Sequence, residues 1–296
     1  MDNSVRISAV VPVHGLENYL PTLKETLLNV ARFPIDVVLI FDRISIGLTT
    51  EVRQFISENK MPRITIIEGH FGSAAAARNA GIAEVKTKWV AFWDADDSPD
   101  PLGYLTLVER AESESIEVGI GIITVENIDD PTRTKSHSID EDSTILNQIA
   151  AFPGFTRMIF QTDFISGIQF QELFLVEDQC FLSDVFSRNP KIGYQPIALY
   201  TYFVGIPTQS ISSQRRYRDH ALALQYIAHN LKSDSPVLTM NLIFVLKLGI
   251  VILLHVRDLS IKEIIRAVVN LTMVLRWPIK SLQAMVALKQ FRSSLT

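Results

Sequence analysis

The sequence predicts an α/β fold in which a mostly parallel central sheet is covered by helices, and three observations favour this class. Short apolar runs alternate with helical patterns over the first 130 residues. The runs are continuous rather than alternating, which is typical of strands buried on both faces. The chain has 296 residues, of which 47% are hydrophobic and 20% charged, so a sizeable core is expected and disorder is excluded as the main state.

The individual elements follow from these runs. The predicted strands are residues 7–13, 36–41, 64–67, 89–93 and 118–124. The predicted helices are residues 19–31, 50–59, 73–85 and 102–112. A Rossmann-like sheet is the expected product, with its ligand site outside the carboxyl ends of the strands. Residues 126–142 are polar and without an apolar period, and they predict a long surface loop.

Composition and charge exclude several functions. The single cysteine, Cys180, excludes an intramolecular disulfide and a cysteine metal cluster, and it fits a reducing compartment. The N-terminus lacks the basic and apolar regions of a signal peptide. Residues 231–296 carry nine Lys or Arg against three Asp or Glu, while residues 1–230 are strongly acidic. The acidic part argues against nucleic-acid binding, and the basic, apolar tail points to an anionic membrane surface.

Three carboxylates follow the predicted strand at 89–93. Asp94 and Asp96 are expected on one side of the chain and Asp97 on the other, because side chains alternate along a strand. Clustered acids repel one another unless a cation or hydrogen-bond donors lie between them, and Mg²⁺ or Mn²⁺ bound to substrate phosphates would provide this. The alternative is a solvated acidic turn that caps a helix.

An alanine-rich helix is predicted after Gly72. Ser73 is a plausible N-cap, and the small side chains let the helix lie close to the sheet. Arg78 would be costly to bury alone, so a phosphate or nucleobase partner is expected. The alternative is an internal ion pair between Arg78 and one of the strand-end acids. The chain carries neither a dinucleotide-binding glycine fingerprint nor a Walker motif.

Five motifs occur together in order and spacing. They are VVPVHGLENYL (10–20), the lone Asp42 after the second strand, GSAAAARNAGI (72–82), FWDADD (92–97) and VEDQCF (176–181). In this combination the chain resembles the family 2 inverting glycosyltransferases of the GT-A fold, over residues 6–215. We therefore expect a GT-A domain at 1–230, with a nucleotide-binding half (1–125) and an acceptor half (126–230), and a helical C-terminal extension at 231–296.

The resemblance implies roles for residues on the nucleotide side. Pro12, Val13 and Asp42 would line the nucleoside pocket, with Asp42 receiving the base, and Arg78 would add to the nucleotide half of the site. Family members usually carry two acids after the second strand, whereas here Asp42 is followed by Arg43. The base is therefore left open, with uridine the family's commonest case.

The resemblance also implies a metal and a catalytic base. Asp94 would face the ribose and the metal, Mn²⁺ or Mg²⁺, and Asp96 would coordinate the metal that holds the donor diphosphate. Glu177 and Asp178 match the acidic pair on the acceptor side, and Asp178 would take the proton from the acceptor hydroxyl. The alternative for this pair is a helix start stabilised by the helix dipole.

The C-terminal tail has three interpretations. Residues 237–256 are about long enough to cross a bilayer, but Lys247 and Asn241 count against a span. A helix lying in the membrane interface or partly buried, a plain core helix and a true span all stay open. Residues 261–291 are apolar with interspersed basic residues, which suits contact with anionic lipid. A further hypothesis is that this tail forms the contact of a homodimer.

These observations predict a metal-dependent glycosyltransferase of hexosyltransferase type. It would use a nucleoside-diphosphate sugar, most commonly a UDP-sugar in this family, and a glycan or lipid-linked acceptor of surface polysaccharide synthesis. It would act in the cytoplasm at the inner face of the plasma membrane. The alternatives are a catalytically silent family member that acts as a scaffold in a polysaccharide assembly complex, and a sugar-1-phosphate nucleotidyltransferase.

Overall fold

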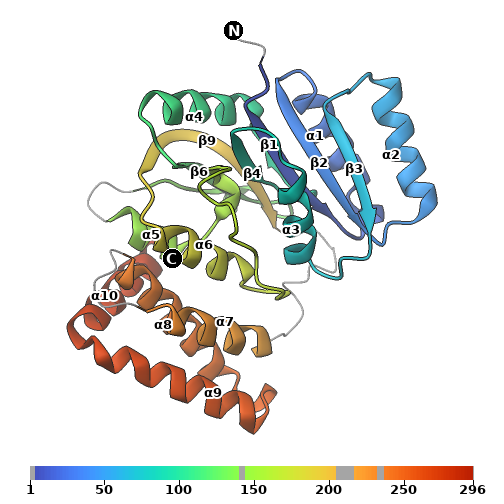
Figure 1. The fold of residues 1–296 in the computed structure, drawn as a ribbon. Coiled ribbons are helices and arrows are strands. Elements are labelled where there is room, and N and C mark those ends of the chain that lie inside the picture. The colour runs from blue at the N-terminus through green and yellow to red at the C-terminus, as the bar shows by residue number, and fades with distance from the viewer. Residues whose placement is uncertain (1–3, 140–143, 205–216, 232–236, 296) are drawn as a thin grey trace. The chain divides into compact units, whose positions relative to one another are not determined.

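The structure is a computed structural model that describes residues 4–139, 144–204, 217–231 and 237–295 (Figure 1). By its internal contacts the chain forms two compact units, each assembled from three chain segments. The first unit is Met1–Ser138, Phe155–Gly167 and Lys191–Thr208, and the second is Ile139–Gly154, Ile168–Pro190 and Gln209–Thr296. The expected division into 1–230 and 231–296 follows the sequence rather than these contacts and stays a prediction.

The first unit is built on a sheet. Its strands are β1 (Ile7–Val13), β2 (Ile35–Asp42), β3 (Ile64–Gly69), β4 (Trp89–Phe92), β5 (Ser98–Pro99), β6 (Val118–Asn127), β7 (Lys135–His137), β8 (Met158–Gln161) and β9 (Ile192–Val204). Within the described residues they form the order β3-β2-β1-β4-β8-β6-β9-β5, with β7 on β6. Strands β1 to β4 pair in parallel, as do β6 and β9, while β5, β7 and β8 pair antiparallel. The predicted α/β class is confirmed.

Helices cover both faces of this sheet (Figure 1). They are α1 (Leu20–Val30), α2 (Ile46–Glu58), α3 (Ala74–Glu84) and α4 (Pro101–Ser113), with short 3-10 turns at Leu16–Asn18, Pro131–Arg133 and Phe155–Arg157. Leu23 of α1 lies with Leu39 on one face. Gly81 of α3 lies on the opposite face, where an added Cβ would stand 2.4 Å from Val10 Cγ1. The expected close approach of the small-residue helix is therefore present.

Two predicted elements are corrected. Helix α2 begins at Ile46 rather than at residue 50, because the Ser45 hydroxyl accepts a hydrogen bond from Leu48 N and caps the helix. The expected loop at 126–142 contains the end of β6, a 3-10 turn and strand β7. This edge strand has a polar face, where the Ser136 hydroxyl lies 3.0 Å from the Thr124 hydroxyl, so it carries no apolar signal in the sequence.

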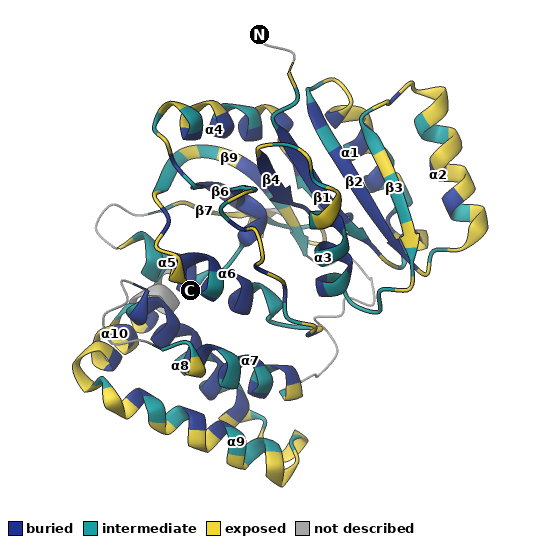
Figure 2. Cartoon of the chain, viewed as in Figure 1, coloured by how far each residue is buried: buried dark blue, intermediate teal, exposed yellow. Residues whose placement is uncertain are grey.

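The second unit is helical among the residues described. It contains α5 (Ile145–Ala151), α6 (Glu177–Ser187), α7 (Tyr217–His229), α8 (Leu238–Leu254), α9 (Ile261–Thr272) and α10 (Pro278–Leu295), with 3-10 turns η5 (Val256–Asp258) and η6 (Met273–Arg276). Helix α8 is in contact with α5, α7, α9 and α10. Ten of its 17 residues are buried, and it is mostly dark in Figure 2. Of the interpretations for 237–256, these contacts correspond to a core helix of this unit.

The lysine within this apolar helix has protein partners. Lys247 Nζ donates hydrogen bonds of 2.9 Å to the carbonyl oxygens of Ala150 and Ala151, the last two residues of α5. Helix C-termini leave carbonyls without donors, so the ammonium group satisfies the end of α5. Over the described part of the chain, no helix is both long enough and apolar enough to cross a bilayer.

Candidate functional site

Three strands of the first unit end at the same edge of the sheet and carry the predicted site residues there. Strand β1 pairs in parallel with β2 on one side and β4 on the other. Pro12 and Val13 end β1, Asp42 ends β2, and Asp94 follows β4 by two residues. Val13 is fully buried and Pro12 is half-buried. The carboxyl ends of parallel strands form the ligand-binding edge of open α/β sheets, so the predicted site lies at the expected place.

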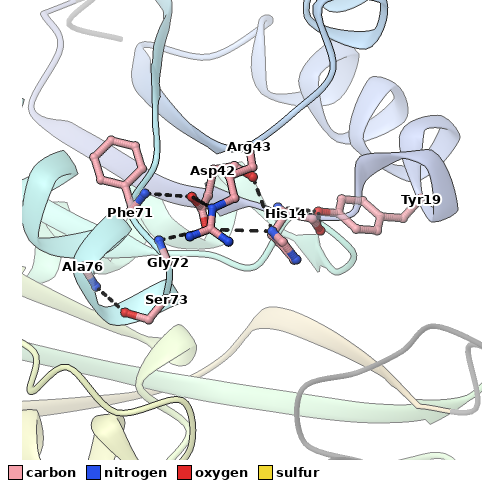
Figure 3. A network of polar contacts seen from close by, with 8 residues as sticks. All are labelled: His14, Tyr19, Asp42, Arg43, Phe71, Gly72, Ser73 and Ala76. Carbon is pink, nitrogen blue, oxygen red and sulfur yellow. Dashed lines mark hydrogen bonds and ion pairs between the residues drawn. The ribbon is translucent and has the colours of Figure 1, made fainter.

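Asp42 organises the chain that follows β3 (Figure 3). Its two carboxylate oxygens accept hydrogen bonds from the amides of Phe71, at 2.7 Å, and Gly72, at 3.1 Å. Gly72 has a φ of 80°, a conformation that glycine adopts at little cost. Arg43 Nε lies 4.0 Å from one oxygen of the carboxylate, which is almost completely buried. Asp42 therefore fixes the backbone that leads into α3.

A second set of contacts joins β1 to Asp42. The Tyr19 hydroxyl donates to the carbonyl oxygen of His14 and accepts from the His14 amide at 3.0 Å (Figure 3). His14 Nδ1 then lies 3.3 Å from the Asp42 carbonyl oxygen and 3.8 Å from its carboxylate. The His14 side chain is 61% exposed, so a solvent-accessible imidazole stands beside the predicted base-binding residue. Neither His14 nor Tyr19 is among the site residues predicted from the sequence.

Helix α3 presents Arg78 to the strand-end acids. The Ser73 hydroxyl accepts from the Ala76 amide at 3.1 Å, which confirms the predicted N-cap. Arg78 is 4% exposed, and its Nη2 donates to Asp94 Oδ1 at 2.7 Å. The guanidinium also lies 4.9 Å above the Phe155 ring. The internal ion pair, which the sequence left as an alternative, is thus present, and Asp94 keeps 32% of its side chain exposed.

The three acids after β4 have different environments. Burial, and then the Asp94 charge, raise the pKa of Asp96 to about 6. Asp97 is 1% exposed, and burial followed by the charges of Asp94 and Asp96 raises its pKa well above the usual range. Its carboxylate accepts from the Tyr200 hydroxyl at 2.8 Å and from the Phe203 amide at 3.0 Å. Asp97 therefore belongs to the protein interior.

Tyr200 connects this interior acid to the predicted metal-binding turn. Its hydroxyl donates to Asp97 and accepts from the backbone amide of Asp94 at 2.8 Å. Tyr200 is 2% exposed, so water does not replace either contact. Tyr200 is not predictable from the sequence as a site residue, because it is 106 positions from Asp94 and no local pattern relates them. Tyr200 and Asp97 therefore contact the site through the backbone amide of Asp94.

The fit of this site to a metal rests on the two partly accessible acids. Among the described residues, no group of three or more His, Cys, Asp or Glu is arranged to hold a metal ion. The Asp94 charge makes ionisation of Asp96 less favourable, and a cation bound by the two carboxylates would relieve this repulsion. Mg²⁺ is commonly bound by one or two carboxylates together with substrate phosphates, so two acids suffice only when a phosphate ligand completes the site.

The predicted acceptor-side pair lies in the second unit. Glu177 and Asp178 form the first turn of α6, as the alternative of a helix start expected. Asp178 Oδ1 accepts from the Gln179 amide at 2.8 Å. The preceding residue, Val176, has a φ of 60°, which is a rare conformation for a β-branched residue. Both acids are half-buried, and their roles stay predictions.

Comparison with known proteins identifies relatives of this chain. The family model described as glycosyl transferase family 2 matches residues 8–174. The chain is 28% identical over 118 residues to the uncharacterized glycosyltransferase YibD of Escherichia coli, a match that covers 40% of this chain and 34% of YibD. It is 24% identical over 145 residues to the succinoglycan biosynthesis protein ExoO of Rhizobium meliloti, covering 43% and 41%. The matches thus span about a third to two fifths of these relatives.

Solved structures show the same fold. The structure of TarS 1–349 from S. aureus in complex with UDP-GlcNAc has a TM-score of 0.69 and 16% identity, covering 98% of this chain and 92% of TarS 1–349. The mannosyltransferase PcManGT from Pyrobaculum calidifontis, in complex with GDP-Man and Mn²⁺, has a TM-score of 0.55 and 15% identity, covering 97% and 86%. The predicted GT-A fold is confirmed, and by the match over more than half of its length the chain belongs to glycosyl transferase family 2.

Proposed function

We propose that this chain is an inverting glycosyltransferase that moves a sugar from a nucleoside-diphosphate sugar, most simply a UDP-sugar, to a hydroxyl of a glycan or lipid-linked acceptor. The observation that carries the proposal is the strand edge at which Asp42, Arg78 and Asp94 lie. The likeness to a UDP-GlcNAc complex supports a nucleotide-sugar donor. The relation to a succinoglycan biosynthesis protein supports a role in polysaccharide synthesis.

The nucleoside would bind at the ends of β1 and β2. Pro12 and Val13 would line this pocket, and Asp42 would receive the base. Two of the lone pairs of the Asp42 carboxylate are used by the amides of Phe71 and Gly72. A carboxylate has about four acceptor sites, so it can also accept a hydrogen bond from a base N–H. The Asp42 carboxylate would then accept hydrogen bonds from both the loop amides and the base.

The diphosphate would bind beside Arg78, Asp94 and Asp96. Asp94 and Asp96 would hold Mg²⁺ or Mn²⁺ together with phosphate oxygens. The metal supplies charge neutralisation for a departing nucleoside diphosphate. The Arg78 guanidinium orients Asp94 through its 2.7 Å ion pair and adds positive charge to this half of the site. Tyr200 and Asp97 hold the Asp94 backbone in place from the interior.

The transfer would be a single displacement at the anomeric carbon. The acceptor oxygen forms its bond to that carbon as the bond to the diphosphate oxygen breaks, and the bonding electrons leave with the nucleoside diphosphate. Asp178 would take the proton of the acceptor hydroxyl, with Glu177 as an acceptor-binding neighbour. General-base assistance contributes a factor of about 10²–10⁴ in rate. Asp178→Asn is therefore expected to slow transfer by that factor and to leave donor binding unchanged.

Thermal stabilisation by a panel of nucleoside diphosphates, with and without Mn²⁺, tests the donor site. The expected result is a metal-dependent rise in melting temperature with one base, which is lost in Asp96→Ala. Asp163→Ala, an exposed acid on the same unit, is the matched control and should keep the rise. The rise should also persist in Asp178→Asn while transfer falls. No stabilisation by any nucleotide would contradict the enzyme and favour the scaffold alternative.

We further propose that the enzyme acts in the cytoplasm at the inner face of the plasma membrane. A lipid-linked or membrane-anchored acceptor is presented at that surface. The net positive, apolar C-terminal segment supports this location.

A further inference from the structure

Helix α9 is amphipathic, and its apolar stripe is turned to solvent. Ile265, Val268 and Val269 are 58%, 49% and 59% exposed, and Ile261 one turn earlier is also exposed. These positions are separated by three or four residues, so they lie on one side of the helix. Figure 2 shows exposed positions recurring along α9. Apolar residues arranged in this way mark a surface that another apolar phase covers.

The stripe continues along the chain. Leu275 in η6 and Ile279, Leu282 and Val286 in α10 are exposed apolar residues. In α10 they again recur at intervals of three and four residues, opposite the buried Ser281, Ala284 and Leu288. Two consecutive helices of the same unit thus each bury one side and leave an apolar side uncovered. Single exposed apolar residues need no explanation, but a stripe on each of two consecutive helices does.

Positive charge accompanies these stripes. Residues 256–289 contain six Lys or Arg and two acids, Asp258 and Glu263. Glu263 is held by the amide and hydroxyl of Ser260, each at 2.8 Å, and lies 3.8 Å from Arg218 Nε. Its charge is therefore compensated locally. The surface around the two stripes is cationic.

A cavity beside the α9 stripe carries two of these cations. It has a volume of about 490 Å³ and is lined by Arg266, Val269 and Asn270 of α9, Arg276 of η6, and His229 of α7. Within the described residues, neither Arg266 nor Arg276 forms an ion pair with a carboxylate. Val269 belongs both to the cavity and to the apolar stripe. The cavity thus places guanidinium groups next to an exposed apolar surface.

We infer that the α9–α10 face docks on an anionic membrane, with lipid phosphate groups at Arg266 and Arg276 and acyl chains against the apolar stripes. Such a face could be covered by a second copy of the chain or by a bilayer, and the charge of the face distinguishes the two. A second copy of the chain in a two-fold contact would bring the same cationic surface against itself, whereas an anionic bilayer is complementary. This inference deepens the proposed membrane location, and it is measurable without transferase activity.

Flotation of the full chain with vesicles tests the inference. Phosphatidylcholine vesicles are compared with vesicles of phosphatidylcholine mixed with phosphatidylglycerol. We expect binding to the mixed vesicles that weakens with added salt. In Arg266→Gln/Arg276→Gln, binding to the mixed vesicles should weaken about 25-fold, since each cation near an anionic surface contributes a factor of about 5. Arg32→Gln/Lys86→Gln removes two exposed cations of the first unit and should bind like the wild type.

A second variant tests the apolar stripe. Ile265→Ser/Val268→Ser/Val269→Ser should lower binding to the mixed vesicles more than about tenfold, because apolar burial anchors interfacial helices. The matched control is Ile46→Ser/Leu102→Ser/Ile128→Ser, which changes three exposed apolar residues of the first unit. Circular dichroism and melting temperature verify that each variant is folded.

Three outcomes would overturn the inference. They are no binding of the wild type to mixed vesicles, binding that the α9 variants leave unchanged, and a dimer in sedimentation velocity that the stripe variant converts to a monomer without any vesicle binding. The nucleotide-stabilisation assay is independent of lipid. Loss of that signal with intact vesicle binding would contradict the proposed function alone.

Discussion

The hydroxyl of Tyr200 offers the sharpest test of how the site is held in place. Tyr200→Phe removes one oxygen that donates to Asp97 and accepts from the Asp94 amide. The site of the lost hydroxyl is buried, because Asp97 is 1% and Tyr200 2% exposed, so water does not replace the lost contacts. Each buried donor or acceptor that is left without a hydrogen-bond partner costs about 1–3 kcal/mol. We therefore expect the free energy of unfolding to fall by about 3 kcal/mol.

Urea unfolding at neutral pH measures this loss, and a scan should show a melting temperature lowered by about 6 °C at roughly 2 °C per kcal/mol for a chain of this size. Tyr202→Phe on the same strand is the control, because the Tyr202 hydroxyl makes no hydrogen bond to a described residue. Metal-dependent nucleotide binding should also weaken, since the Asp94 backbone loses its anchor. A Tyr200→Phe stability within 1 kcal/mol of the control would refute the bridging role.

Three further predictions concern packing, pH and the helical unit. Gly81→Ala should lower the free energy of unfolding by about 1–3 kcal/mol in urea, because its Cβ would stand 2.4 Å from Val10 Cγ1; unchanged stability would show that α3 moves freely. Burial raises the pKa of Glu112, but hydrogen bonds led by that from Arg6 outweigh it and lower the pKa. The free energy of unfolding of Glu112→Gln should therefore be about 1 kcal/mol below that of the wild type at pH 7. This difference should shrink as the pH falls below the ordinary pKa of 4.5, because the wild-type carboxylate is then protonated. A difference in stability that stays constant across melts at a series of pH values would contradict this. Lys247→Met should lower the free energy of unfolding, measured in urea, by about 2 kcal/mol, because the last carbonyls of α5 lose their donor. A variant as stable as the wild type would contradict this capping role.

The sequence predicted those parts of the fold that leave a local signal. The continuous apolar runs at 7–13 and 36–41 identified the parallel strands β1 and β2, and Ser73 identified the start of α3. Strand β7 gave no such signal, because its residues are polar and it pairs at an edge of the sheet. Strand β8 is short and pairs antiparallel with β4 and β6, so its identity depends on distant partners.

The same distinction holds within the site. Strand alternation was the reason given for separating Asp97 from Asp94 and Asp96, but β4 ends at Phe92 and these acids lie in the turn that follows it. The structure shows that Asp97 is buried and bonded to Tyr200 and Phe203. The partner of Asp97 was not predictable, because Tyr200 is 103 residues away. Both hypotheses for Arg78 gave its guanidinium a partner, and only the fold shows that Asp94 is one. The acids could thus be predicted from the local sequence, whereas their environments depend on tertiary contacts.

The contact between Lys247 and the end of α5 has a consequence for synthesis of the chain. The sequence separation between Ala150 and Lys247 is 97 residues. A ribosome adding about 5–20 residues per second needs about 5–20 s to produce that stretch. During this interval the buried side of α5, including Ile149, lacks the helix that covers it. The nascent chain therefore keeps this apolar side of α5 uncovered until α8, and after it α10, has been made and can pack against it.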